Sequence, residues 1–242
     1  MKKKFSLITT VYNGENTIEK TIESVISQTF KDYEYIIIDA LSEDKTLKIV
    51  NKYEKHISKI ISEPDKSIYE GMNKGIRNSN GDIIGIINSG DTYSKNALEI
   101  INNCFENNKE IDFVFGTVFK KKILYKYEPK KIWWSFNFYP AHSGGFFIKK
   151  KIQDEIGYYD TRYKCSDDYD FFYKLIVKNK KRGMITKKDQ LIANFDSGGY
   201  SSRLSLFEHM IEETNIRINN KQNKIIVLTM FILKFLKHYF KI

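Results

Sequence analysis

The chain has 242 residues, 41% of them hydrophobic, and a formal net charge of +10. This length and composition fit one domain, or one domain plus a tail, with a substantial core, and they exclude a disordered protein. The two cysteines, Cys104 and Cys165, are too few and too scattered for a disulfide framework or a zinc site. No apolar run reaches the ~18 residues that a membrane-spanning helix requires. The positive charge allows anionic partners such as nucleotides, nucleic acid or an acidic lipid surface.

The first half of the chain alternates predicted strands with predicted helices. Strands are expected over residues 5–10, 34–39, 56–62, 82–87 and 112–116. Helices are expected over residues 16–28, after Ser42 as a plausible N-cap, and over residues 67–77 and 96–105. The alternation predicts βαβ units around a mostly parallel sheet flanked by helices. In such sheets ligands bind beyond the carboxyl ends of the strands, where "TTVYN", "DALSED", "SEPDKS" and "NSGD" lie.

The second half has a different pattern. Aromatic and basic stretches precede a predicted strand, "GGFFIKK", and a predicted helix through "DDYDFFYKLIVK". A further helix is expected over residues 204–219, after the loop "DSGGYSS", whose glycines give the backbone freedom to act as a flap. Neither the G-x-G-x-x-G of dinucleotide-binding domains nor the phosphate-binding G-x-x-x-x-G-K-[ST] occurs, so a nucleotide pocket would be of another design.

The order and spacing of five stretches carry a family resemblance. They are "SLITTVYNGENTIEKTIESVISQTF", "EYIIIDALSEDKTLKIV", "ISEPDKSIYEGMNKGI", "NGDIIGIINSGD" and "SDDYDFF". Over residues 5–200 the chain resembles glycosyltransferase family 2, closest to bacterial enzymes that build surface polysaccharides of the O-antigen or capsule type. The resemblance implies a GT-A fold with a catalytic domain over residues 1–220. It also implies inverting transfer of a sugar from a nucleotide diphosphate, expected to be uridine diphosphate, to a saccharide acceptor.

The resemblance also implies a metal ligand at the end of the strand that precedes "NSGD". A divalent cation held by a carboxylate neutralises the charge that develops on the leaving diphosphate. The family usually has two acids here, whereas this chain has Gly90 followed by Asp91. Asp91 is therefore the expected ligand of Mn²⁺ or Mg²⁺, with weaker metal affinity because of Gly90. The alternative is a strand-end turn stabilised by Asn and Asp side chains.

Donor-binding residues are carried over in the same way. Asp39 is expected to accept the uracil imide hydrogen, although an acid there also suits a helix cap. Asp65 is expected to meet the ribose or the sugar, with Asn73 beneath it, and the alternative is a Pro-Asp turn. The remaining expected contacts of the nucleotide sugar are Thr10, Tyr12, Asn13, Asn88, Ser89 and Gly90.

The acidic pair in "CSDDYDFF" matches the position of the family's catalytic base. Inverting transfer needs a carboxylate that takes the proton of the attacking hydroxyl. Asp168 is the expected base and Asp167 is expected to orient the acceptor. Acids favoured by the dipole at a helix start are the alternative. His142, in "PAHSGGFFIKK", is expected beside the acceptor.

The tail over residues 221–242 predicts a basic amphipathic helix. Residues 217–242 hold six basic side chains and no acid. At ~100° per residue, Lys234, Lys237 and Lys241 share one face, opposite an apolar face made of Ile225, Leu228, Ile232, Phe235, Leu236 and Tyr239. We expect it to lie on an anionic membrane surface, at the cytoplasmic side, where the acceptor would be linked to polyprenyl diphosphate. The alternative is packing on its own domain or in a homodimer.

Two other classes of function stay open. A catalytically weakened family member that acts as a membrane-bound partner is consistent with Gly90. A nucleic-acid-binding protein is consistent with the charge of +10, but the chain shows no recognition module and its basic residues are not interleaved with aromatic ones on one strand face. No nucleic-acid partner is therefore expected.

Overall fold

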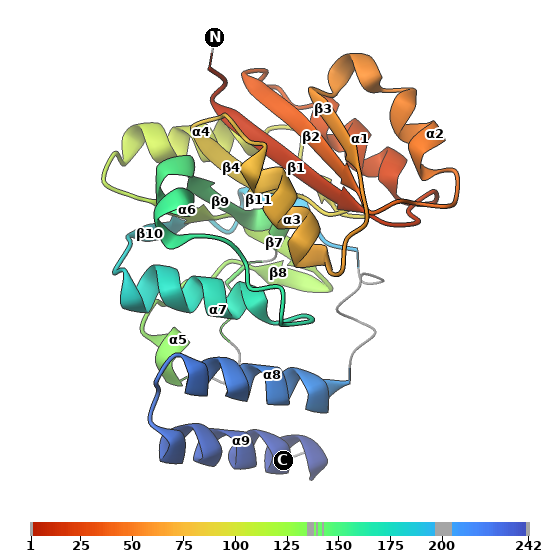
Figure 1. Cartoon of the computed structure of the whole chain (residues 1–242). Helices are drawn as coiled ribbons and strands as arrows, with labels where there is room; N and C mark the ends of the chain where they lie inside the picture. The colour runs from red at the N-terminus through yellow and green to blue at the C-terminus, as the bar shows by residue number, and fades with distance from the viewer. Residues whose placement is uncertain (1, 135–137, 139, 142, 197–204, 241–242) are drawn as a thin grey trace.

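The computed structural model describes residues 2–134, 138, 140–141, 143–196 and 205–240. Figure 1 shows a layered α/β body with three helices, α7, α8 and α9, stacked beneath it. The main sheet has seven strands, in the order β10 (Gly183–Ile185), β6 (Phe113–Phe115), β9 (Phe146–Lys149), β4 (Ile83–Ile86), β1 (Phe5–Val11), β2 (Tyr33–Asp39) and β3 (Lys59–Ser62). Only β9 runs antiparallel to its neighbours in this sheet. The predicted mostly parallel sheet is therefore confirmed.

A second, smaller sheet lies beside the main one. It has the strand order β5 (Thr92–Tyr93), β11 (Leu191–Asn194), β7 (Thr117–Lys120) and β8 (Lys122–Leu124). The sequence did not predict these strands, because they have only two to four residues each and show no hydrophobic period of their own. Strand β11 pairs antiparallel with β5 and parallel with β7. This pairing brings together three segments that are far apart in the sequence.

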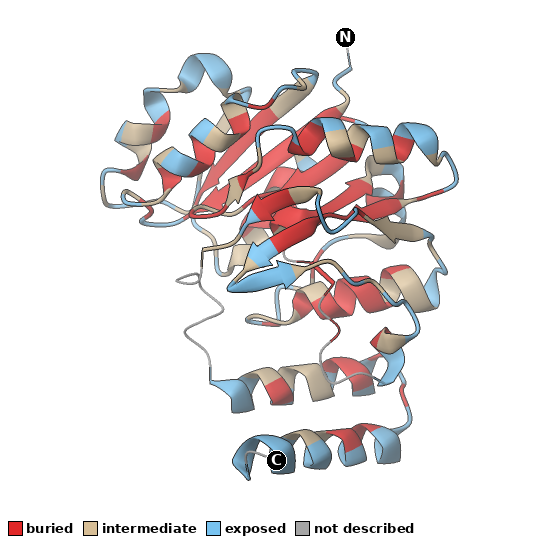
Figure 2. Cartoon of the chain, turned by 180° about the vertical axis from the view of Figure 1, so that it is seen from behind, coloured by how far each residue is buried: buried red, intermediate tan, exposed pale blue. Residues whose placement is uncertain are grey.

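Helices cover the main sheet and extend the body below it (Figure 1). They are α1 (Ile18–Ile26), α2 (Thr46–Asn51), α3 (Ile68–Arg77), α4 (Ala97–Asn107), α5 (Lys131–Trp134), α6 (Lys150–Ile156), α7 (Asp167–Tyr173), α8 (Leu206–Asn219) and α9 (Lys224–Tyr239). Helix α7 continues as a π-helical segment, Lys174–Lys178. Figure 2 shows that the strands are mostly buried and that α9 exposes much of its surface.

Side-chain caps mark the start of α3, α8 and α9. Ser67 caps α3 as expected, since its hydroxyl accepts a hydrogen bond from the amide of Glu70. The prediction for Ser42 was wrong: α2 begins at Thr46, whose amide donates to the carboxylate of Asp44 over 2.9 Å. The Ser42 hydroxyl instead accepts from the amide of Asn13, which ties the turn after β1 to the turn after β2.

The two C-terminal helices, α8 and α9, form a stack beneath α7 (Figure 1). Helix α9 contacts α8, and α8 contacts α7. The buried side chains Val227 and Met230 face α8, and the ammonium of Lys234 pairs with Glu213 at 2.7 Å. Within the described part of the chain, every helix is too short or too polar to cross a bilayer.

Candidate active site

The carboxyl ends of β1 and β4 are joined by hydrogen bonds. The Thr10 hydroxyl donates to Oδ1 of Asn88 over 2.8 Å, and the amide of Ser89 donates to the carbonyl of Thr10. Ser89 also shares a hydrogen bond with the hydroxyl of Thr17 at the start of α1. These contacts bring three of the predicted donor-binding residues together at one edge of the sheet.

Asp39 ends β2 beside this edge and is fully buried. Its carboxylate accepts from the Ser62 hydroxyl over 2.7 Å and from the amide of Ser42. The predicted aromatic neighbour, Tyr12, is 61% exposed, so its ring is accessible to a ligand. Asn13 follows it in the left-handed backbone region (φ 46°) and accepts from the amide of Glu43. Asp39 and Tyr12 thus lie on two neighbouring turns. The carboxylate of Asp39 is buried, and the ring of Tyr12 is exposed to solvent.

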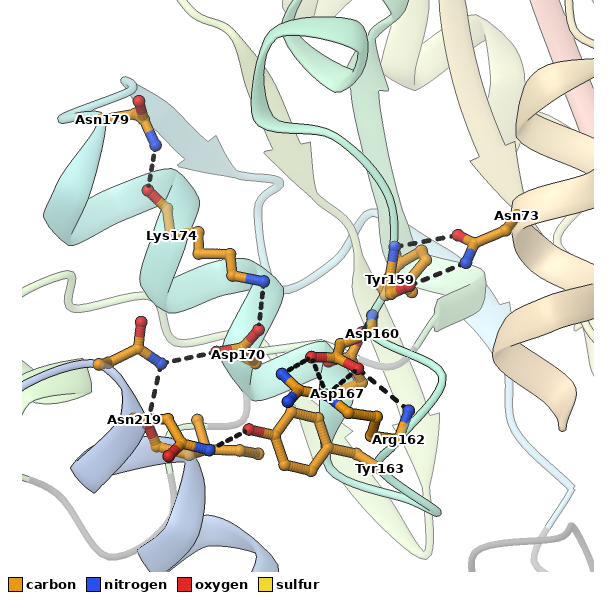
Figure 3. A network of polar contacts seen from close by, with 12 residues as sticks. Asn73, Tyr159, Asp160, Arg162, Tyr163, Asp167, Asp170, Lys174, Asn179 and Asn219 are labelled. Atoms are coloured by element: carbon orange, nitrogen blue, oxygen red, sulfur yellow. Dashed lines mark hydrogen bonds and ion pairs between the residues drawn. The ribbon is translucent and has the colours of Figure 1, made fainter.

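Asp65 also reaches the same edge. A Cβ on Gly71 would lie 2.9 Å from Oδ2 of Asp65 and 3.3 Å from Cγ2 of Thr10, so the glycine lets α3 approach both. Lys74 forms an ion pair with Asp65 at 2.8 Å. Asn73 is engaged differently, because both ends of its amide bond the backbone of Tyr159 (Figure 3). We therefore assign Asn73 to holding the loop before α7.

Gly90 and Asp91 lie in the turn between β4 and β5, where the backbone of Gly90 has a φ of +103°. Because β5 and β11 are antiparallel and Asn194 lies opposite Thr92, extending the register by two residues places Asp196 opposite Gly90. The structure agrees, since a Cβ on Gly90 would lie 3.6 Å from Oδ2 of Asp196. The amide of Asp196 also donates to Oδ1 of Asp91 over 2.9 Å. A second carboxylate therefore stands beside the position where the family's first acid is missing.

Asp91 is a buried carboxylate surrounded by other charged groups. Burial raises the pKa of Asp91 to about 7, and the neighbouring Asp196 carboxylate adds to the rise. Two lysines oppose it: Lys20, which pairs with Asp196 at 2.7 Å, and Lys120 at the end of β7. Burial lowers the pKa of Lys120, while the carboxylates of Asp91 and Asp168 raise it. Lys120 is thus in the electrostatic field of both the predicted metal ligand and the predicted base.

A divalent cation fits this pair of acids. Mg²⁺ and Mn²⁺ are commonly held by one or two carboxylates, with phosphate oxygens and water completing the shell. Asp91 and Asp196 supply two carboxylates, although no group of three or more His, Cys, Asp or Glu side chains in the described residues could hold a metal ion. The remaining ligands would have to come from substrate and solvent.

The predicted catalytic acids open α7. Asp167 is fully buried, its Oδ2 accepts from the amide of Asp160 over 2.6 Å (Figure 3), and its Oδ1 is buried without a hydrogen-bond partner. Burial raises the pKa of Asp167 to about 8, helped by Asp170. Burial also raises the pKa of the half-buried Asp168, to about 6, against a hydrogen bond from the Tyr69 hydroxyl that lowers it. At neutral pH the pair can present one protonated and one ionised carboxyl group.

Sequence reasoning missed Asp196 and Lys120. The acid in "NFDSGG" was visible, but only the antiparallel register of β11 with β5 brings it to Gly90. Lys120 is the last residue of an unpredicted strand, so nothing in the sequence linked it to the site. The expected acceptor residue His142 and the glycines of the expected flap, Gly198 and Gly199, lie outside the described residues.

Comparison with known proteins agrees with this geometry. The sequence profile described as Glycosyl transferase family 2 matches residues 6–208. An uncharacterized glycosyltransferase of Methanocaldococcus jannaschii is 28% identical over 201 residues, which are 76% of this chain and 68% of the relative. A PGL/p-HBAD biosynthesis glycosyltransferase of Mycobacterium bovis is 23% identical over 69% of this chain and 67% of its own length.

Solved structures show the same fold at low identity. The first 349 residues of S. aureus TarS, in complex with UDP-GlcNAc, align with a TM-score of 0.71 at 17% identity, covering 98% of this chain and 72% of that one. The mannosyltransferase PcManGT of Pyrobaculum calidifontis, solved with GDP-Man and Mn²⁺, aligns with a TM-score of 0.70 at 15% identity, covering 98% and 70%. This chain spans only 43% of a longer TarS structure. Because the family profile covers most of the sequence and the central sheet with its helices has the GT-A arrangement, the chain belongs to glycosyltransferase family 2.

Proposed function

We propose that the chain is a metal-dependent, inverting glycosyltransferase that uses a uridine-diphosphate sugar and a saccharide acceptor. The observation that carries this proposal is the pairing of Asp91 with Asp196, with Lys120 in the field of both Asp91 and the acid Asp168. A leaving diphosphate needs positive charge on one side, and an attacking hydroxyl needs a carboxylate on the other. Asp91 follows β4, Asp196 follows β11, Lys120 ends β7 and Asp168 lies in α7.

The donor would lie across the carboxyl ends of β1, β2 and β4. Asp39 accepts the imide hydrogen of uracil, and the exposed ring of Tyr12 covers the base, with Thr10 and Asn13 beside it. Asp65 bonds the ribose or the sugar, and Asn88, Ser89 and Gly90 line the path to the diphosphate. The turns that carry these residues are already joined by hydrogen bonds, which lowers the entropic cost of ordering them on binding.

Asp91 and Asp196 would hold Mn²⁺ or Mg²⁺ against the diphosphate. When bound, the ion supplies positive charge that stabilises the leaving group. Lys20 and Lys120 add two more positive charges at the same place. Asp196 thereby provides the second acid that Gly90 does not, from another strand.

Asp168 would act as the base. Its pKa of about 6 leaves it ionised at neutral pH and close enough to that pH to accept a proton effectively. The acceptor oxygen forms a bond to the anomeric carbon, and the bond from that carbon to the diphosphate oxygen breaks with its electron pair on the leaving group. The acceptor proton passes to Asp168. Asp167 is buried next to Asp168, and its pKa of about 8 keeps it protonated at neutral pH, so it adds no second negative charge there.

We further propose that the acceptor is linked to a lipid and that the chain works at the cytoplasmic face of the membrane. Only one side of α9 is used against α8, and its outer side is apolar and exposed: Ile225, Leu228, Ile232, Leu236 and Tyr239. Lys234 is paired with Glu213 of α8, whereas the exposed lysines Lys224 and Lys237 lie on a helix that contains no acid. An anionic bilayer complements both the apolar face and the charge.

The names of related proteins support a nucleotide-sugar donor. A solved neighbour binds UDP-GlcNAc, whereas another was solved with GDP-Man and Mn²⁺. The mycobacterial relative is named for PGL/p-HBAD biosynthesis. The experiment that tests the proposal therefore compares donors with different bases.

A panel of UDP-, GDP- and dTDP-sugars, tested by thermal shift and by release of the nucleotide diphosphate, gives that experiment. A ligand that binds the folded state raises the melting temperature according to its concentration over Kd. We expect one UDP-sugar to raise it further with Mn²⁺ than with EDTA and to be hydrolysed slowly. A shift confined to GDP-sugars would overturn the role of Asp39 in uracil recognition. Donor binding without turnover would favour a catalytically weakened family member.

A further inference from the structure

The loop before α7 has an unusual anchor. Three consecutive backbone amides, those of Lys164, Cys165 and Ser166, all donate to the carboxylate of Glu212 on α8, over 2.7, 3.0 and 3.1 Å. The thiol of Cys165 donates to the same carboxylate over 3.1 Å. The N-cap residue Ser166 offers no side-chain hydrogen bond of its own to α7. The helix that carries the two acids is therefore fixed at its start by a carboxylate from another helix.

Consecutive amides that point to one side form a concave site for an anion, and hydrogen bonds to a charged acceptor are the stronger kind. Although burial raises the pKa of Glu212, the bonds from Lys164, Cys165 and Ser166 hold it below its ordinary value. Burial raises the pKa of Cys165 to about 12, so its thiol stays a donor. Glu212 is thus an ionised group with four donors aimed at it.

Other contacts join the same two helices further along. Asn220 donates to Oδ1 of Asp170 over 2.6 Å. Asn219 donates to the hydroxyl of Tyr163, in the loop before α7, over 2.9 Å (Figure 3). The guanidinium of Arg217 lies 4.9 Å from the ring centroid of Tyr169. Helix α8 therefore holds α7 along its length, and Glu212 holds the three residues that lead into its first turn.

We infer that Glu212 is a positioning residue, which sets the base Asp168 in place by fixing the backbone of residues 164–166. This inference rests on the proposed function, in which Asp168 takes the acceptor proton. Glu212 lies on α8 and its carboxylate is occupied by the loop, so it acts through α7 and not on the substrate. A base works only within hydrogen-bond reach of the hydroxyl, and a displacement of about 1 Å can cost on the order of 100-fold in rate.

The test compares Glu212→Gln with Glu208→Gln in the full chain. Both changes remove one charge from α8, but Glu208 bonds Ser205 in the capping box at the helix start, where Gln also serves as a cap. The probes are UDP, for binding, and the UDP-sugar that the parent protein hydrolyses in the panel. We expect Glu212→Gln to lower kcat for hydrolysis about 10- to 100-fold with Kd for UDP unchanged, and Glu208→Gln to change neither.

Two further measurements separate positioning from general stability. Hydrogen exchange of the peptide over residues 164–170 should become faster in Glu212→Gln and not in Glu208→Gln. In the Asp168→Asn background, Glu212→Gln should cause no additional loss, because residues that act as a unit are not additive. If Glu212→Gln does not fold, Glu212→Asp, which keeps the charge and withdraws it by one methylene, replaces it with the same expected direction.

The outcomes distinguish this inference from the proposed function. Unchanged exchange over residues 164–170, or faster exchange with unchanged turnover, overturns the positioning role and leaves the proposed function standing. An additional loss in the Asp168→Asn background also overturns it. A parent protein that hydrolyses no nucleotide sugar overturns the proposed function, and the positioning role falls with it.

Discussion

The amide of Asp196 donates a hydrogen bond to Oδ1 of Asp91 over 2.9 Å, although the two residues are 105 positions apart in the sequence. The contact follows from the antiparallel register of β5 and β11, which sets Asp196 opposite Gly90. It gives the site two carboxylates where the local sequence offers one. Three predictions concern this pair.

Asp91→Asn should keep the fold and lose metal-dependent donor hydrolysis by about 100-fold or more, because the amide is a poor ligand for a hard cation. Turnover of the active UDP-sugar is measured over a Mn²⁺ titration, with Asp154→Asn on α6 as the control. Asp154 pairs with Lys150 away from the site. Full activity of Asp91→Asn that is insensitive to EDTA would remove Asp91 from the metal site.

Asp196→Asn should weaken Mn²⁺ binding by about tenfold or more while Asp91 stays in place. The substitution keeps the hydrogen bond from the backbone amide of residue 196 to Asp91 and removes only the side-chain charge. Calorimetric titration of Mn²⁺ in the presence of UDP measures this directly, without turnover. An unchanged Mn²⁺ affinity would mean that the Asp196 carboxylate pairs with Lys20 and does not bind the metal ion.

Gly90→Asp, which restores the family's usual acid, should lower the melting temperature. A side chain at φ +103° is strained, by about 1–3 kcal/mol, and the new carboxylate would crowd that of Asp196. Gly90→Ala carries the same strain without the charge. We therefore expect Mn²⁺ to restore more of the melting temperature in Gly90→Asp than in Gly90→Ala, and equal recovery would place position 90 away from the ion.

Asp168→Asn should bind UDP like the parent and lose hydrolysis by about 100-fold or more, since it removes the proton acceptor. Burial holds the pKa of Asp168 near 6, above its ordinary value. The active, ionised form therefore appears as the pH rises through about 6, and the parent rate should rise over that range. The residual turnover of Asp168→Asn should not show this rise with pH. Undiminished turnover would move the base to another group, with Asp167 the next candidate.

Serine at Leu228, Ile232 and Leu236 should release the chain from vesicles containing phosphatidylglycerol, with donor hydrolysis in solution unchanged. These side chains are exposed, whereas Val227 and Met230 form the contact with α8 and stay intact. Ile123→Ser on β8, also exposed, is the control for loss of an apolar side chain. Sedimentation with vesicles is the measurement. Undiminished sedimentation, or a change from dimer to monomer in light scattering, would show that this face binds something other than lipid.

Much of the site's outline was predictable from the sequence. The apolar runs of β1, β2 and β4 and the cap at Ser67 are local signals. They correctly placed Asp39 at the end of β2, Asp91 in the turn after β4 and Ser67 at the start of α3. The acids at the start of α7 followed from a short motif in the same way. Hydrophobic period and capping depend on residues within a few positions of each other, so a linear reading captures them.

The tertiary structure alone decided which remote groups meet. Asp196 reaches Gly90 through the pairing of two strands of two and four residues, too short to carry a signal in sequence. Asn73 is engaged by the backbone of Tyr159, and Glu212 by the loop before α7. In the tail, the helical period was predictable from the sequence. Only tertiary packing placed Lys234 against Glu213 and left the apolar side of α9 exposed to solvent. Register and partner choice depend on long-range contacts that no local window contains.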